Sequence, residues 1–180
     1  MSAFVSSDPG DATDVVDVVD VVDDLSRHLP HAREFDRAAL IPGMYLCWCA
    51  RLDLLEQGFA EQHAEQLLQL RYRDGSCVDL FVTGCDGTLR FSHLNERGAR
   101  FTREYYSRYI ELWRDTFVSD ASLSDSSSSD SASSDMYGVS DSWETYEKIA
   151  GPLTQALLGP PNTQKASIAI PRSWWRFWQR

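Results

Sequence analysis

The stretch AALIPGMYLCWCARLDLL, residues 38–55, carries the clearest helical pattern in the chain. From Met44 to Leu55 its large side chains recur at the i, i+3/i+4, i+7 spacing of a helix face that packs on a core. We place Pro42 in the first turn, where a missing amide donor costs nothing, and we expect Gly58 to end the helix. The stretch therefore predicts the first core helix of a helical fold.

Three later segments also predict helices. The first spans Glu61–Leu70, and its expected inward residues are Ala64, Leu67 and Leu68. The longest spans Glu96–Phe117, with Asn95 as its N-cap. Aromatic and aliphatic residues mark its inward face: Phe101, Tyr105, Tyr109, Leu112, Trp113 and Phe117.

The last predicted helix follows Asp141, which we take as its N-cap, with Glu144 completing a capping box. Gly159 and the two prolines after it should stop this helix. Its expected inward residues are Trp143, Tyr146, Ile149, Leu153 and Leu157.

The segment 71–93 fits two structures. Asp74-Gly75 and Asp86-Gly87 are turn pairs, and strands beside them would make a β-hairpin. We favour a short helix over Val78–Val82, followed by extended chain at Thr88–Phe91. The fold class predicted from all these segments is mostly α: a compact bundle of about four to five helices with a small irregular or β-hairpin insert.

Composition divides the 180 residues into parts. Residues 1–24 hold seven Asp and no Lys or Arg, and Asp-Val-Val repeats there with a period that fits neither helix nor strand. We expect this acidic low-complexity extension to be solvated and poorly ordered; a short induced helix or an added edge strand is the alternative. A single helical domain should span 25–158, interrupted by a flexible Ser/Asp-rich loop at 119–140. Residues 159–180 form a Trp-rich C-terminal tail.

The formal net charge of −10 comes from two acidic tracts, the N-terminal extension and the Ser/Asp-rich loop. The rest of the chain is nearly neutral. A chain of this charge lacks the basic stripe that phosphate contacts require, so we expect no nucleic-acid partner. The N-terminal residues lack a basic segment followed by an apolar run, and no stretch is long and apolar enough for a membrane span. We therefore expect a cytoplasmic protein that does not insert stably into membranes.

Residues able to do chemistry are scattered. Cys47 and Cys49 would point to opposite sides of a helix, so they cannot share one zinc ion. The four histidines show no recognisable arrangement with a nucleophile, and the acidic residues near 79–96 fit turn and cap roles. We expect buried thiols, no catalytic centre, no cofactor and no metal.

Charged and aromatic side chains are the better candidates for contact with a partner, since these residue types dominate tight interfaces. The Trp-rich tail has three readings: it covers an apolar patch of its own domain, docks on a partner, or touches a membrane surface. The candidate partner-binding residues are Asp79 and Asp86 in the Asp-Gly segment, Arg97, Arg100, Glu104 and Arg108 on the long helix, and Trp174, Trp175 and Trp178 in the tail.

Four motifs in fixed order carry a family resemblance. They are GMYLCWC at 43–49, CDGTL at 85–89, LNERG at 94–98 leading to Phe101 and Tyr105-Tyr106, and DSWETYEKI at 141–149. This order resembles a family of short, uncharacterised bacterial proteins from about Leu29 to Leu158, often with a similar Trp-rich ending. The Asp-Val-Val extension and the serine tract depart from that pattern.

Proteins of that sort tend to be encoded near secreted polymorphic or type VI toxins, so the resemblance implies an immunity protein that neutralises a cognate toxin by direct binding. The acidic tracts could steer a cationic effector towards it. The alternative is a general interaction or adaptor module whose partner is not a toxin. In either case we expect a monomer or small homo-oligomer and no enzyme.

Overall fold

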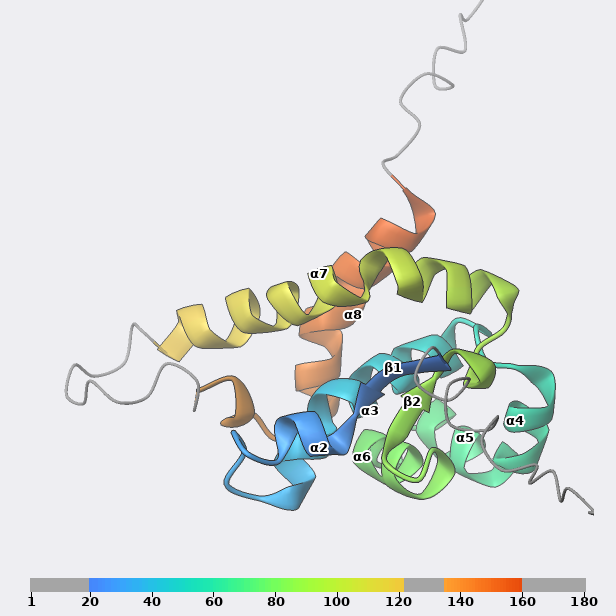
Figure 1. Ribbon diagram of the computed structural model, residues 1–180, viewed down its shortest axis with the longest axis horizontal. Helices are drawn as coiled ribbons and strands as arrows, with labels where there is room; N and C mark the ends of the chain where they lie inside the picture. The colour runs from blue at the N-terminus through green and yellow to red at the C-terminus, as the bar shows by residue number, and fades with distance from the viewer. Residues whose placement is uncertain (1–19, 122–134, 160–180) are drawn as a thin grey trace, which may run out of the picture.

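The computed structural model describes residues 20–121 and 135–159, and these form a mostly helical body with one small sheet (Figure 1). The predicted fold class is therefore confirmed. Its elements in chain order are β1 Val21–Asp24, α2 Leu25–His28, α3 Phe35–Arg51, α4 Gln57–Gln62, α5 Ala64–Arg71, α6 Cys77–Asp79, the π-helical turn η1 Leu80–Gly84, β2 Thr88–Arg90, the 3-10 turns η2 Phe91–His93 and η3 Asp135–Tyr137, α7 Glu96–Ala121 and α8 Trp143–Leu158.

Helix α3 is the centre of the molecule. Twelve consecutive residues, 38–49, are buried, so the helix is covered on every side and not only along the predicted stripe. It begins at Phe35, three residues earlier than predicted, which places Pro42 inside the helix and not in its first turn. The helix tolerates the lost amide donor because the surrounding elements hold it in place. Its end also differs, because the helix stops at Arg51 well before Gly58.

Helix α6 packs against α3 at a point where only glycine fits. A Cβ atom on Gly43 would lie 2.8 Å from the carbonyl oxygen of Cys77. The short helix favoured for the 71–93 segment is present as α6 and η1. The absence of a side chain at Gly43 therefore lets α3 and the Cys77 segment pack directly against each other.

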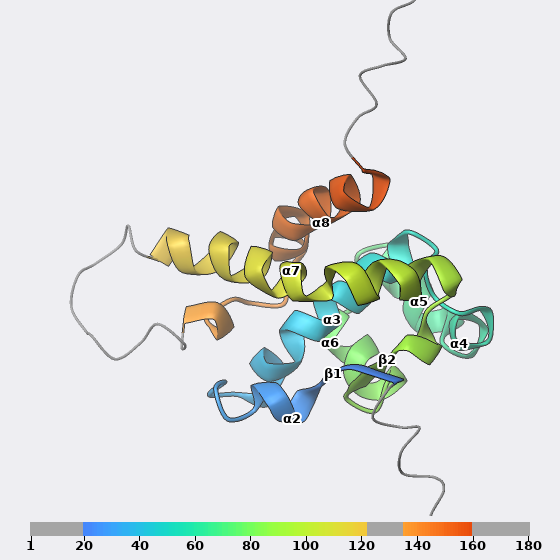
Figure 2. The same cartoon turned by 45° about the horizontal axis from the view of Figure 1, so that its top comes forward.

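Helices α7 and α8 cover the other side of α3. Figures 1 and 2 show α7 running alongside α3 and α8 crossing α7. Tyr109 and Trp113 of α7 are fully buried, as the predicted aromatic face requires. The Asn95 side chain accepts a hydrogen bond from the Gly98 amide at 2.9 Å, which confirms the predicted N-cap. The indole N–H of Trp48 donates to the Thr154 hydroxyl of α8 at 3.1 Å and links α8 to α3.

The sheet pairs two strands that are far apart in the sequence. Strand β1 runs antiparallel to β2, with Val21 opposite Arg90 and Asp24 opposite Thr88. The pairing register shifts between Val21 and Asp23. Residues 21–24, the last of the acidic extension, thus form an edge strand, which is the alternative given for this segment in the sequence analysis. The Asp-Val-Val pattern could not show this, because the partner strand lies more than sixty residues away.

Local details differ in two other helices. The segment predicted as one helix at 61–70 is divided into α4 and α5, and Leu68 is exposed, not inward, with 53% of its surface accessible. The N-cap of α8 is Ser142, whose hydroxyl accepts from the Thr145 amide at 3.2 Å. Asp141 has a different role, because its carboxylate accepts from the Ser76 hydroxyl at 2.6 Å. Within the described ranges, no helix combines the length and apolar character that crossing a membrane requires.

Candidate functional site

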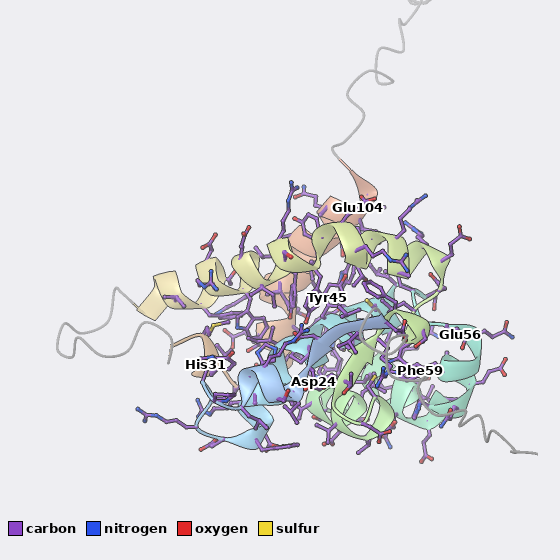
Figure 3. The ribbon with its side chains drawn as sticks, in the orientation of Figure 1. Asp24, His31, Tyr45, Glu56, Phe59 and Glu104 are labelled. Atoms are coloured by element: carbon purple, nitrogen blue, oxygen red, sulfur yellow. The ribbon has the colours of Figure 1, made fainter. Side chains whose placement is uncertain are left out.

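The four candidate residues on the long helix share one exposed face of α7. Arg97, Arg100, Glu104 and Arg108 are all exposed, and Figure 3 shows Glu104 on the side of α7 that faces away from α3. None of them forms an ion pair with another described residue, although Glu104 and Arg108 are four positions apart on the helix. The face offers charge to solvent without an organised centre.

The other candidates do not join this face. Asp79 ends α6 and Asp86 lies in the turn before β2, where its backbone has a φ of 50°. Both are exposed, but α3 lies between α6 and α7 (Figure 1). Trp174, Trp175 and Trp178 lie outside the described residues. The structure thus brings the α7 candidates together and leaves the two aspartates on a different side.

A second surface, which the sequence did not reveal, combines arginines with aromatic rings. We call it the arginine–aromatic surface; its residues are Arg51, Tyr72, Arg73, Trp143 and Glu147. The guanidinium of Arg51 lies 5.5 Å from the ring centre of Trp143, and that of Arg73 lies 5.7 Å from the same ring. Each contact is within the range of a cation–π interaction. Tyr72, which precedes Arg73 in the chain, is 71% exposed.

Hydrogen bonds fix this surface to three helices. The indole N–H of Trp143 donates to the Arg73 carbonyl at 2.9 Å, and Arg73 pairs with Glu147 at 2.6 Å. Arg51 donates to the carbonyl of Leu70 at 3.3 Å. The sequence indicated Trp143 as an inward residue of the last helix, whereas its indole bridges the start of α8 to the end of α5. The nearest sequence signal was the run Arg-Tyr-Arg at 71–73 just before a turn.

Arg73 holds an unusual backbone conformation. Its φ is 65°, in the left-handed region, directly after the last turn of α5. Glycine is the common residue at this position because a side chain costs free energy there. Left-handed residues other than glycine concentrate at functional sites, where the surrounding structure holds them. The conformation places the Arg73 side chain over Trp143.

Two cavities flank the arginine–aromatic surface. The larger, of about 590 Å³, is a groove between the end of α3 and helices α4 and α5, and we call it the α3–α5 groove. The smaller, of about 230 Å³, lies between the Asp74–Cys77 turn and the start of α8. The α3–α5 groove is lined by Ala50, Arg51, Asp53, Leu55, Ala60, Ala64, Leu67, Leu68, Leu70 and Arg71.

A buried polar cluster lies elsewhere, where β1 meets α2, α7 and η3. The carboxylate of Asp23 is 3% exposed and accepts from the Tyr106 hydroxyl at 2.5 Å. Its Oδ2 atom also lies 2.9 Å from His28 Nε2, and His28 Nδ1 lies 2.9 Å from the Tyr137 hydroxyl. Burial and the charge of Asp23 raise the pKa of Tyr106 well above its ordinary value. Neither cavity described above is lined by these residues, and the cluster ties three distant segments together.

The thiols are buried and free, as expected from the sequence. Burial raises the pKa of Cys85 to about 12, and it also raises the pKa of Cys49. A thiol with a raised pKa is a poor nucleophile, because the thiolate is the reactive form. Within the described parts of the chain, no three His, Cys, Asp or Glu side chains are grouped so that they could hold a metal ion.

Comparison with known proteins gives one match. The family model of a domain of unknown function, DUF7832, matches residues 21–126. No curated protein and no solved structure matches the chain. The family match starts at the first residue of β1 and covers every element through α7, so the matched region and the described fold begin at the same strand.

Proposed function

This chain belongs to the DUF7832 family of domains of unknown function, and we propose that it works by binding another protein, as an immunity protein that neutralises a cognate secreted toxin. The observation that carries the binding role is the arginine–aromatic surface. Trp, Tyr and Arg are the residues that contribute most binding free energy at protein interfaces. Here they are presented together, beside two cavities, on helices that the core holds rigid.

Preorganisation favours this surface over the charged face of α7. Arg51 and Arg73 are already stacked on Trp143, so little side-chain freedom would be lost on binding. On α7 each contact of this kind joins one arginine to one ring, Arg103 to Phe91 at 4.6 Å and Arg108 to Tyr105 at 5.9 Å. The charges of α7 therefore fit a role in steering a partner more than in holding it.

The toxin as partner class is supported by the order of the four sequence motifs, which resembles proteins encoded near secreted toxins. An inhibitor of this kind needs a rigid surface that covers or distorts its target. It does not need to turn over a substrate. The family description itself assigns no function.

Co-expression tests the proposal. Each protein encoded directly beside this gene is expressed with and without the chain, and growth and complex formation are measured. We expect one neighbour to stop growth when expressed by itself, growth to return with this chain, and both proteins to co-purify in a fixed ratio. A neighbour that binds without being toxic would instead indicate an adaptor. Toxicity that this chain relieves without forming a complex would contradict the binding role.

A further inference from the structure

The α3–α5 groove leaves apolar side chains open to water. Leucines and alanines make up most of its lining, and Leu68 at its rim is 53% exposed. Tyr72, which directly follows the last residue of α5, is 71% exposed. Its volume of about 590 Å³ is in the range of sites that hold drug-sized ligands, about 300–1,000 Å³. Such a groove has room for aromatic side chains.

We propose that the groove binds the Trp-rich end of this same chain, the segment RSWWRFWQR at 172–180. Four aromatic rings in nine residues would each gain from leaving water, at about 150–250 Å² of burial per ring. These residues lie outside the described structure. The groove, the chemistry of the segment and the length of chain that joins them support the docking.

Groove and segment both carry a net positive charge, and they match through individual groups: arginines with aromatic rings, and one carboxylate with arginines. Arg51 and Arg71 line the groove and offer guanidinium groups to ring faces. Arg51 already makes such contacts, at 5.5 Å from Trp143 and 5.7 Å from Tyr146. The segment carries three arginines of its own, and Asp53 in the lining offers them a carboxylate.

The connecting chain is long enough. Helix α8 has 16 residues and so spans about 24 Å. Its first residue, Trp143, contacts Arg51 at the groove, so the helix ends roughly 25–35 Å from it. The thirteen residues 159–171 reach at most about 43–47 Å. Tethering gives the segment a local concentration on the order of millimolar, so even weak contacts keep the groove filled.

Indole N–H signals in heteronuclear NMR spectra of the full chain test this inference without any partner. The signals of Trp174, Trp175 and Trp178 are assigned with single Trp→Phe variants. In Leu68→Glu, where a charge enters the groove, we expect at least two of these three signals to move to the positions they have in the free peptide 172–180. Leu29→Glu is the matched control, because Leu29 is 42% exposed and directly follows α2, away from the groove.

Signals that stay in place in Leu68→Glu, or that move equally in Leu29→Glu, would overturn the inference. So would signals that already coincide with those of the free peptide in the unchanged protein. Signals that shift on tenfold dilution would show that the segment binds a second copy, which also contradicts docking within one chain. Because the experiment contains no toxin, its outcome is independent of the proposed function.

Discussion

At the scale of single residues, Asp23 shows how a position in an acidic repeat becomes part of the core. Its carboxylate joins Tyr106 of α7 and His28 of α2, and His28 continues to Tyr137. A buried carboxylate is tolerated only when hydrogen bonds replace its hydration. The two partners of Asp23 come from different elements, so Asp23 fixes the edge strand to the body of the protein.

We therefore expect Asp23→Ala to destabilise the fold. The change leaves the Tyr106 hydroxyl and the His28 ring buried without their acceptor, at about 1–3 kcal/mol for each unsatisfied group. Urea unfolding followed by circular dichroism should show a lower midpoint with an unchanged m value. Asp20→Ala is the control, because its hydrogen bonds to Ser92 are exposed and should matter by less than about 1 kcal/mol. Equal midpoints for the two variants would contradict this role of Asp23.

His93 gives the fold a pH dependence of known sign. Burial, and secondly the charge of Arg90, lower the pKa of this histidine, and Asp20, Asp86 and His63 also act on it. Its neutral ring stacks on Phe59 with 4.9 Å between ring centres. A histidine whose pKa is lowered by folding binds more protons when unfolded, so its contribution is present above about pH 6.5 and is lost as pH falls below that value.

The prediction is that His93→Gln reduces the loss of unfolding free energy below pH 6.5. The measurement is a series of urea titrations from pH 7.5 to pH 5 on both proteins, with the difference between them plotted against pH, because other groups also titrate there. His31→Gln, at an exposed position, should leave the curve unchanged. If the wild type and His93→Gln keep a constant difference, His93 does not act through its protonation.

At the scale of elements, two glycines in helices have opposite roles. A Cβ on Gly98 would lie 2.5 Å from the Leu54 carbonyl oxygen, so α7 approaches the segment that follows α3 only because this residue has no side chain. Gly151 in α8 meets nothing within 4 Å. Gly98 is needed for close packing, whereas the described structure leaves room for a side chain at Gly151.

Substitution by alanine should separate them. Gly98→Ala forces backbone apart and should cost about 1–3 kcal/mol, as overpacking generally does. Gly151→Ala should raise stability by up to about 1 kcal/mol, because alanine favours the helix interior. Thermal unfolding of both variants measures this: the melting temperature should fall for the first and rise for the second. A rise for Gly98→Ala would contradict the close approach of α7 to Leu54.

Sequence patterns predicted the helices and caps that depend on residues close together in the chain. The periodicity of α3 and α7, the Asn95 cap and the stop at Gly159 all follow from neighbouring residues. Contacts between distant residues were missed. Strand β1 needs β2 as its partner, and the capping role expected of Asp141 is taken by Ser142 because Asp141 binds Ser76 instead. The arginine–aromatic surface was not predicted at all, because Arg73 and Trp143 are 70 positions apart and no local sequence pattern joins them.

At the scale of the whole molecule, the proposed function requires that the arginine–aromatic surface binds a partner. Arg73 allows its binding role to be tested apart from stability. Glycine at this position relieves the left-handed backbone conformation, a gain of about 1 kcal/mol. It also removes an exposed ion pair with Glu147, a loss of about 0.2–1 kcal/mol. We expect Arg73→Gly to unfold within about 1 kcal/mol of the wild type in urea, and a larger loss would show that Arg73 serves the fold.

The most direct measurement is the affinity of the co-purified partner for three proteins by isothermal titration calorimetry: wild type, Arg73→Gly and Arg100→Gln. Arg100 is exposed on α7 and forms no ion pair with a described residue, so it tests the other candidate face. The account predicts that Arg73→Gly weakens binding at least about 30-fold, equivalent to about 2 kcal/mol, while Arg100→Gln changes it by less than about threefold. Unchanged affinity for Arg73→Gly, together with a large loss for Arg100→Gln, would contradict it.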